Sequence, residues 1–332
     1  MRVLVTGGAG FMGSHFVRHL LRTYPDCTVV NLDKLTYAGN PANLADVAGD
    51  PRYRFVHGDI CDAPLVREVM AGCDAVVNFA AESHVDRSIQ DAGAFVRTNV
   101  DGTWVLLETA RAHRAGRFLQ VSTDEVYGPI AGDPVGERAP LRPSSPYAAA
   151  KAAGDYLALA YWTTHRLPVV VTRAANNFGP NQYPEKLIPL FITNALDDQP
   201  LPLYGDGRQV RDWLYVLDHS AALDLVLHRG AEGEVYNLGG GREIENIELT
   251  RRILALLGKP ECLIRPVADR PGHDRRYALD TTKLRALGWQ PAHPFDVALA
   301  ATVAWYRANE SWWRPLKSGE FLAYYRRQYG AP

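Results

Sequence analysis

The chain opens with a strand-like run that leads into three regularly placed glycines and then into a helical pattern. Residues 2–6 are largely apolar or β-branched, Gly7, Gly10 and Gly13 follow, and residues 12–23 have helical apolar spacing. In such a turn the first glycine permits a tight bend, the second lets backbone N–H groups approach a pyrophosphate, and the third allows close helix–strand packing. The segment therefore predicts a dinucleotide-binding βα unit.

Asp33 bears on which dinucleotide would bind. It lies twenty residues beyond Gly13, at the end of the next predicted strand, residues 28–33. A carboxylate there can accept hydrogen bonds from both ribose hydroxyls of adenosine, and it would repel the extra phosphate of NADP. The glycines alone could serve only tight packing, but the strand, the helix and Asp33 together favour NAD as the cofactor.

Short apolar runs alternate with helical patterns through the first half of the chain. The predicted strands are residues 2–6, 28–33, 53–57, 75–78, 118–122 and 168–173. The predicted helices between and after them are residues 12–23, 102–112 and 147–164. Runs that are apolar throughout, such as 169–171, are typical of strands covered on both faces. We predict an α/β fold with a Rossmann-type, doubly wound parallel sheet.

The second half is less regular. After residue 173 come loops with Asn, Gly and Pro, a helix at 189–196, a strand at 235–238, and a mixture of helix and loop from about residue 241. We therefore expect a smaller, mixed C-terminal lobe that binds the substrate. The predicted division is a NAD-binding Rossmann domain of residues 1–174 with a return segment at about 212–240, and a substrate lobe of residues 175–211 and 241–332.

Composition narrows the class of partner. The formal net charge of the 332 residues is -1, which gives no overall attraction to nucleic acid or an anionic membrane. No apolar run approaches the roughly 18 residues of a membrane-spanning helix. The four cysteines have no metal-like spacing, and the chain begins with a strand pattern instead of a signal peptide. We expect a cytoplasmic protein with a small-molecule substrate, and no metal, nucleic acid or membrane partner.

Tyr147 and Lys151 are a candidate catalytic pair. They stand four residues apart on the predicted helix 147–164, so they share one face. An unperturbed tyrosine has a pKa of about 10, which is too high for a base at neutral pH. A nearby ammonium and the positive ring of oxidised nicotinamide would both favour the phenolate, which could then take a proton from a substrate hydroxyl. A Tyr and a Lys at this spacing also occur by chance, so the neighbouring sequence must show whether the pair is catalytic.

Thr123, Asp124 and Glu125 directly follow the predicted strand 118–122. Ligands of open α/β sheets bind beyond the carboxyl ends of the strands. Two adjacent carboxyl groups in a closed site tend to separate their pKa values, so that one can donate a proton and the other accept one. An isolated Asp–Glu pair is more often a solvated turn, but this position favours an acid–base pair.

Four motifs together resemble the extended short-chain dehydrogenase/reductase family: TGGAGFMG from Thr6, NFAA from Asn78, STDEVYG from Ser122 and YAAAK from Tyr147. The resemblance covers nearly the whole chain, and it implies that Thr123, Tyr147 and Lys151 form the catalytic set. Within that family, the adjacent Asp124 and Glu125 separate dehydratases from simple 4-epimerases and reductases.

Four further stretches resemble the dTDP-glucose 4,6-dehydratases: residues 81–88, 176–180, 184–189 and 269–276. The resemblance implies an NAD-dependent hydro-lyase that converts dTDP-glucose to dTDP-4-keto-6-deoxyglucose for deoxysugar biosynthesis. C4 would be oxidised, water eliminated across C5 and C6, and C6 reduced with the recycled NAD. The catalytic residues would be Thr123, Asp124, Glu125, Tyr147 and Lys151.

The same resemblance places the ligand contacts. The implied cofactor-binding residues are Gly7, Gly10, Phe11, Met12, Gly13, Asp33, Lys34, Leu35, Thr36, Asp59, Ile60, Phe79, Ala80, Ala81, Ser83, Thr98, Tyr147, Lys151 and Asn177. The implied substrate-binding residues are Ser83, Thr123, Asn176, Lys186, Leu187, Pro202, Tyr204, Arg211, Asn246, Arg270 and His273. Physically, the cationic members could clamp a pyrophosphate, and the tyrosine could stack on a nucleobase.

Some residues carry other interpretations. We interpret His84, Asp86 and Arg87 as structural, because an Asp–Arg pair near a helix start usually caps or bridges. Phe321 stands where the family has a tyrosine that contacts the base or the sugar.

Two alternative functions stay open. A UDP-sugar 4-epimerase would share the fold and the Tyr–Lys pair, but the acidic pair and residues 269–276 argue against it. A non-catalytic NAD-binding regulator would be expected to lose Tyr147 or Lys151. By analogy with the family, we also expect a homodimer in which the helices 102–112 and 147–164 pair across a two-fold axis.

Overall fold

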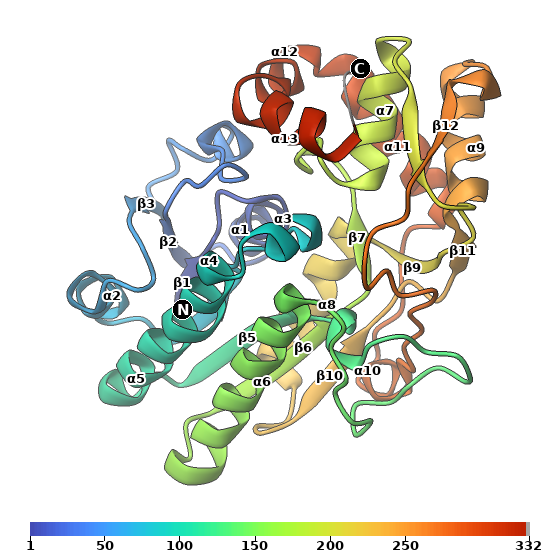
Figure 1. Ribbon diagram of the computed structural model, residues 1–332. Helices are drawn as coiled ribbons and strands as arrows, with labels where there is room; N and C mark the ends of the chain where they lie inside the picture. The colour runs from blue at the N-terminus through green and yellow to red at the C-terminus, as the bar shows by residue number, and fades with distance from the viewer. Residues whose placement is uncertain (330–332) are drawn as a thin grey trace.

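A seven-stranded parallel sheet forms the centre of the computed structural model, which describes residues 1–329. The strand order is β10-β6-β5-β4-β1-β2-β3 (Figure 1). The strands are β1 (Arg2–Thr6), β2 (Thr28–Asp33), β3 (Tyr53–His57), β4 (Ala75–Asn78), β5 (Arg117–Thr123), β6 (Val169–Ala174) and β10 (Val235–Leu238). The predicted Rossmann-type sheet is confirmed, and β10 pairs in parallel with β6 although more than sixty residues separate them.

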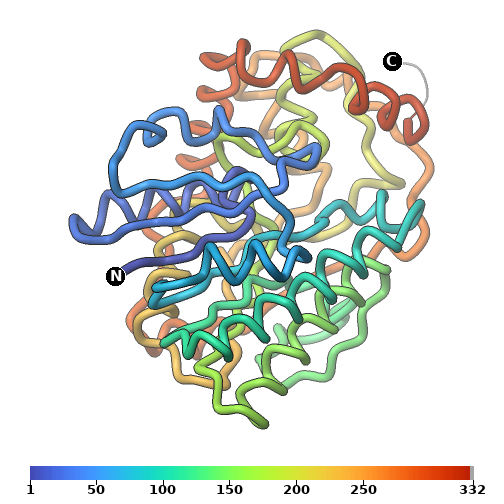
Figure 2. Tube along the Cα trace, turned by 90° about the vertical axis from the view of Figure 1, so that its left-hand side faces the viewer, coloured from blue at the N-terminus to red at the C-terminus, as the bar shows by residue number. Residues whose placement is uncertain are grey.

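Helices cover both faces of this sheet, because successive side chains of each strand point to opposite faces. On one face Val3 and Val5 pack with helices α1 (Phe11–Thr23) and α8 (Val216–Arg229). On the other face Leu4 packs with three helices, α2 (Ala63–Met70), α5 (Thr103–His113) and α6 (Pro146–His165). Figures 1 and 2 show the two layers, with α5 and α6 side by side.

Two small sheets lie outside the main one. The first has the order β11 (Glu243–Glu245), β9 (Val210–Tyr215), β7 (Asn176–Phe178) and is mixed, and the second pairs β12 (Ile264–Val267) with β8 (Leu201–Tyr204). The sequence pattern predicts only loops and helix where β7, β9, β11 and β12 form. These strands have three to six residues and pair with partners far along the chain, so tertiary contacts outweigh the local pattern.

Helices α7, α9 and α11 enclose a second core around Phe178, Trp213 and Tyr306. The helices of this part are α7 (Leu187–Leu196), α9 (Asn246–Leu257), α11 (Phe295–Ala308), α12 (Glu310–Trp313) and α13 (Glu320–Tyr329). Helix α10 (Thr282–Ala286) instead packs against β10 of the main sheet. Shorter helical segments are η1 (Pro41–Leu44), α3 (Val85–Gln90), α4 (Gly93–Val96), η2 (Arg97–Gly102), η3 (Asp124–Tyr127), η4 (Glu261–Leu263) and η5 (Pro315–Lys317). Within residues 1–329 no helix combines the length and apolar character needed to cross a bilayer.

The glycine turn after β1 yields a stability prediction. A Cβ atom on Gly13 would lie 2.4 Å from the carbonyl oxygen of Gly7, whereas one on Gly49 would meet no atom within 4 Å. We expect Gly13→Ala to lower the free energy of unfolding by about 1–3 kcal/mol, because β1 and α1 would have to move apart. Urea unfolding measures this, with Gly49→Ala as the matched control. Equal effects of the two substitutions would contradict the close-packing role.

Candidate active site

The glycine turn brings backbone close to backbone at the carboxyl end of β1. Gly7 has a φ of +69°, and a Cβ atom there would lie 2.6 Å from the amide nitrogen of Ala80. Helix α1 begins after Gly10 without a side-chain cap on its first N–H groups. An uncapped helix N-terminus at a bare glycine turn is suited to a phosphate group.

Asp33 ends β2 beside this turn. Its two carboxylate oxygens accept hydrogen bonds from the amides of Ala9 at 2.9 Å and Leu35 at 2.8 Å. These bonds orient the carboxylate at the cavity wall and leave each oxygen able to accept again. Burial raises the pKa of Asp33, and the two amide hydrogen bonds oppose that rise.

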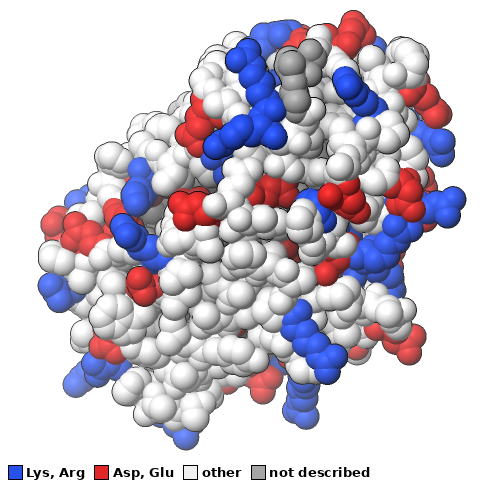
Figure 3. Space-filling model, viewed as in Figure 1, with Lys and Arg blue, Asp and Glu red and all other residues white. Residues whose placement is uncertain are grey.

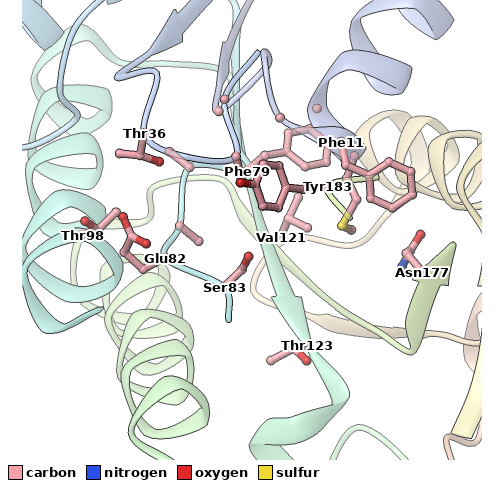
Figure 4. A pocket seen from close by; sticks show the side chains of 18 of the residues that line it. Phe11, Thr36, Phe79, Glu82, Ser83, Thr98, Val121, Thr123, Asn177 and Tyr183 are labelled. Atoms are coloured by element: carbon pink, nitrogen blue, oxygen red, sulfur yellow. The ribbon is translucent and has the colours of Figure 1, made fainter. Parts of the chain in front are cut away.

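A cavity of about 280 Å³ opens over the carboxyl ends of β1, β4 and β5 (Figure 4). All but one of the predicted cofactor residues line it: Gly7, Gly10, Phe11, Met12, Gly13, Asp33, Lys34, Thr36, Asp59, Ile60, Phe79, Ala80, Ala81, Ser83, Thr98, Tyr147, Lys151 and Asn177. Leu35 does not line it, and has a left-handed φ of 54° in the turn that its amide makes with Asp33. We call this space the cofactor cavity, because a Gly-rich helix start, an acidic strand end and an apolar floor suit NAD.

Several lining residues of the cofactor cavity are absent from the sequence prediction. Among them are the polar residues Glu82, Gln182, Tyr183 and Glu185. Glu82 and Glu185 lie inside family motifs, so their positions carried a signal. Gln182 and Tyr183 belong to an irregular loop whose approach to β1 depends on the packing of the second core.

A second cavity of about 150 Å³ adjoins the first, and we call it the substrate cavity. Its walls include nine of the predicted substrate residues: Asn176, Lys186, Leu187, Pro202, Tyr204, Arg211, Asn246, Arg270 and His273. Ser83 and Thr123 line the cofactor cavity instead. Glu125, Asn176 and Lys186 are among the residues that line both cavities, so the two spaces meet at Glu125.

The cationic side chains of the substrate cavity differ in how far they are already paired. Lys186 donates to the carbonyl of Ser83 at 2.8 Å, and Arg211 donates to the carbonyl of Asp274 at 2.9 Å. Arg270 instead pairs with the carboxylate of Asp86 at 2.9 Å. Lys186 and Arg211 are thus the buried cations with neutral partners, and burial lowers the pKa of both.

Asp86 and Arg87 form bridges, but not with each other. Asp86 pairs with Arg270 and also accepts from the hydroxyl of Tyr204 at 3.0 Å, whereas Arg87 pairs with Glu185. Both residues still bridge structure, but they bridge to segments about a hundred or more residues away that only the fold brings near.

The C-terminal aromatic of the substrate cavity is Tyr329. The family comparison of sequence motifs suggested Phe321 for that place, but Phe321 packs inside the second core. Tyr329 lines the substrate cavity, and the ring centroids of Tyr204 and Tyr329 are 5.9 Å apart. Two turns of α13 separate Phe321 from Tyr329, so a shifted reading of this helix explains the error.

The predicted catalytic residues meet where the cofactor cavity touches β5. Thr123 ends β5, and its hydroxyl accepts from the amide of Glu125 at 3.3 Å. Helix α6 begins at Pro146 and carries Tyr147 and Lys151 on successive turns. The ammonium of Lys151 donates to the carbonyl of Val121 at 2.6 Å. All five predicted catalytic residues line the cofactor cavity.

Burial outweighs the expected effect of Lys151 on Tyr147. Desolvation, followed by the charge of Glu125, raises the pKa of Tyr147, while a hydrogen bond with Thr123 lowers it. Burial lowers the pKa of Lys151 from 10.5 to about 8. Burial therefore disfavours the phenolate of Tyr147 in the chain alone, and nearby positive charge would oppose that effect.

Asp124 and Glu125 lie in different electrostatic surroundings. Burial raises the pKa of Asp124 far above its usual value, and the charge of Glu125 raises it further. Burial also raises the pKa of Glu125, but Arg270, Lys186 and Arg211 lower it. The pair is thus arranged with Asp124 as the proton donor and Glu125 as the stronger candidate base.

Comparison with known proteins identifies the family. The model described as GDP-mannose 4,6 dehydratase matches residues 4–302. A dTDP-glucose 4,6-dehydratase from Streptomyces niveus is 59% identical over 323 residues, 96% of each chain. The crystal structure of a double mutant of the Streptomyces venezuelae dTDP-glucose 4,6-dehydratase, with NAD bound, has a TM-score of 0.94 at 56% identity and covers 96% of this chain and 100% of that one. The chain belongs to the dTDP-glucose 4,6-dehydratase family.

Epimerases share the fold of this dehydratase family at lower identity. The UDP-glucose 4-epimerase of Thermus thermophilus, in complex with NAD, has a TM-score of 0.86 at 33% identity and covers 93% of this chain and 100% of that one. Fold alone therefore does not separate the two activities. Membership of the dehydratase family, which the sequence motifs predicted, is confirmed by the identity to the Streptomyces proteins.

The structure has no group of three or more His, Cys, Asp or Glu side chains arranged to hold a metal ion within residues 1–329. The four cysteines are free, and two of them, Cys27 and Cys73, are buried.

Lys151 supplies a pH-dependent stability prediction. The pKa of Lys151 is about 8 in the folded chain, against an ordinary value of 10.5. Below pH 8 the buried ammonium therefore lowers the free energy of unfolding. This penalty becomes smaller as the pH rises from 8 toward 10.5, the pKa in the unfolded chain. In NAD-free protein we expect Lys151→Met to raise the free energy of unfolding by about 1–3 kcal/mol at neutral pH, and by less near pH ~9.5.

Urea titrations at the two pH values measure the effect. Lys259→Met is the control, because Lys259 pairs with Asp198 at the surface, and we expect it to change stability by no more than about 0.5 kcal/mol. A gain for Lys151→Met that is equal at both pH values would contradict the buried, depressed ammonium.

Proposed function

We propose that the protein converts dTDP-glucose to dTDP-4-keto-6-deoxyglucose as an NAD-dependent hydro-lyase of deoxysugar biosynthesis. The observation that carries the proposal is the junction at Glu125, where an acid–base pair, a Tyr–Lys pair and a cation-lined cavity meet. The relatives named dTDP-glucose 4,6-dehydratase and the NAD-bound Streptomyces venezuelae structure support it.

The cofactor cavity would hold NAD through the glycine turn, the uncapped start of α1 and Asp33. Bound NAD would supply a hydride acceptor for C4 and later the donor for C6, so it would be regenerated in each turnover. Its positive ring would add the charge that Tyr147 needs to ionise. The chain itself must hold the cofactor, orient the sugar and exclude water.

Tyr147 takes the proton from O4 as C4 is oxidised, with Thr123 hydrogen-bonding to the reacting oxygens and Lys151 placing positive charge nearby. The resulting ketone acidifies the hydrogen at C5. Glu125 then removes that proton, and Asp124 donates a proton to O6 so that water leaves. This order matches the surroundings of the two carboxyl groups, because Asp124 is the more strongly held in its protonated form.

The substrate cavity would take the nucleotide diphosphate. Lys186, Arg211 and Arg270 supply positive charge for the two phosphates, and Tyr204 supplies an aromatic face for the base. Cations at one end and Glu125 at the other orient the sugar so that C5 and C6 face the acid–base pair. An epimerase would not need this pair, and a non-catalytic regulator would not need the buried Tyr147 and Lys151.

We also propose the domain division and the assembly. Residues 1–174 with about 212–240 form the NAD-binding domain, and residues 175–211 with 241–332 form the nucleotide-sugar lobe, although residues 330–332 of that range lie outside the described residues. The protein acts in the cytoplasm as a homodimer that pairs α5 and α6. Two large side chains on these helices support that interface, since Trp104 and Tyr156 are 50% and 58% exposed. Few charged side chains lie over this face (Figure 3).

Two substitutions separate the oxidation step from the elimination step. We expect Tyr147→Phe to abolish oxidation of C4, so that no reduced nicotinamide forms. Glu125→Gln should still permit oxidation but block removal of the C5 proton, so that reduced nicotinamide accumulates. Stopped-flow absorbance of the reduced ring after mixing with dTDP-glucose measures both. Identical behaviour of the two variants would contradict these roles.

The nature of the product tests the proposed function. Purified protein is incubated with dTDP-glucose or UDP-glucose and then treated with alkali, which converts a 4-keto-6-deoxy sugar to a chromophore. We expect the chromophore with dTDP-glucose. A 4-epimer as the product would refute the dehydratase assignment.

The dimer interface is tested by charge insertion. We expect Trp104→Glu combined with Tyr156→Glu to give monomers, because carboxylates would be buried against apolar surface without partners. Analytical ultracentrifugation measures the change. Val297→Glu is the control, since Val297 is also exposed but lies on α11. Dimers that survive the double substitution would place the interface elsewhere.

A further inference from the structure

Arg87 is a partly buried cation that belongs to neither cavity wall. It lies on the short helix α3, and its side chain is only 16% exposed. The residues around both cavities do not include it. Its substitution would therefore remove no direct contact with cofactor or substrate.

Its guanidinium group joins three separate segments of the chain. The Nε atom donates to the carboxylate of Glu185 at 3.2 Å, and Nη1 donates to the carboxylate of Glu320 on α13 at 2.5 Å. The carbon at the centre of the group lies 3.9 Å from the ring centroid of Tyr37 and 4.9 Å from that of Tyr324. One planar cation thus holds two carboxylates and two aromatic rings.

Each of these segments forms part of a cavity wall. Tyr37 lies between Thr36 and Ala38, which both line the cofactor cavity. The ring of Tyr37 packs edge-on against that of Tyr183, which lines the same cavity from a distant part of the chain. Helix α13 also carries Tyr329 into the wall of the substrate cavity. Arg87 therefore contacts, from outside the two cavities, segments that would surround the ligands, and one of its partners, Glu185, itself lines both cavities.

We propose that Arg87 is a positioning residue that fastens the 34–39 loop, the 182–186 segment and α13 together over bound NAD, and so sets how slowly NAD leaves. The inference rests on the proposed function, in which the cofactor reduced at the first step must still be present at the last. A site that released the reduced cofactor between these steps would leave the sugar as a keto intermediate that cannot be reduced at C6.

The shape of the arginine side chain suits it to this position. Glu185 has a side chain that is only 1% exposed, so losing its guanidinium partner would leave a buried carboxylate that only Lys186 and Tyr37 still stabilise. Lysine could retain one ion pair, but it cannot donate to two carboxylates in a fixed fork while presenting a flat face to two rings. Removal of Arg87 would therefore loosen all three segments together.

The test measures retention of NAD in the absence of sugar. NAD-loaded protein is diluted, passed through a desalting column at intervals, and the NAD remaining in the protein is quantified by chromatography. We expect Arg87→Met to release NAD about tenfold faster than the wild type, and Arg87→Lys to fall between the two. Arg314→Met is the matched control, because Arg314 pairs with Asp197 and Glu310 at the surface of the same lobe, and its release rate should equal that of the wild type.

Excess NAD provides a second readout. Since Arg87 touches no reacting atom, saturating NAD should restore most of the kcat of Arg87→Met, while the KM for NAD stays raised. Should Arg87→Met fail to fold, Glu320→Gln decides the question, because it removes the ion pair between Arg87 and α13, leaves the contact with the Tyr324 ring, and should still speed NAD loss. Release rates within twofold of the wild type for the folded variants would overturn the proposal.

The retention assay uses no sugar, so it separates this proposal from the proposed function. A wild-type protein that holds NAD, loses it on substitution of Arg87, and yet gives no keto-sugar would refute the dehydratase assignment and leave the role of Arg87 standing.

Discussion

The burial of four ionisable side chains at the carboxyl end of β5, away from solvent, is the constraint on which the rest of the site depends. Two carboxyl groups, a phenol and an ammonium face one cavity, and burial is the largest cause of the pKa shift of each. In open solvent the four groups would have ordinary pKa values and no division of roles. Excluding water from them also protects the enone intermediate and the reduced cofactor from side reactions while both occupy the site.

The two lobes contribute differently to this environment, since one positions catalytic side chains and the other supplies positive charge. The parallel sheet supplies a rigid platform on which Thr123, Tyr147 and Lys151 are placed by β5 and α6. The smaller lobe supplies Arg270, Lys186 and Arg211, whose charges lower the pKa of Glu125 against the effect of burial. Neither lobe alone would make the pKa values of Asp124 and Glu125 differ. The assignment of one carboxyl group as acid and the other as base therefore requires both lobes.

The sequence predicts the sheet and much of the site well, because both depend on local signals. Strands such as 28–33 and 75–78 are largely apolar runs, so the local sequence is enough to predict that they are buried. The motifs locate the catalytic residues by their spacing. It predicts the smaller lobe poorly. The strands β7 and β9 pair across more than thirty residues, and the partners of Asp86 and Arg87 come from α13 and from the loops before α7 and after β12. Such contacts leave no periodic pattern in the chain, and the shifted assignment at Phe321 has the same origin.

In the proposed reaction one site oxidises C4, eliminates water and reduces C6 with the same cofactor molecule. An isotope-crossover experiment tests this with a mixture of dTDP-glucose deuterated at C4 and undeuterated dTDP-glucose labelled with ¹³C. We expect mass spectrometry and NMR to find deuterium at C6 of the keto-sugar product, and only in molecules that began with deuterium at C4. Deuterium retained at C4 of an epimerised sugar, or deuterium found in the ¹³C-labelled product, would refute this reaction.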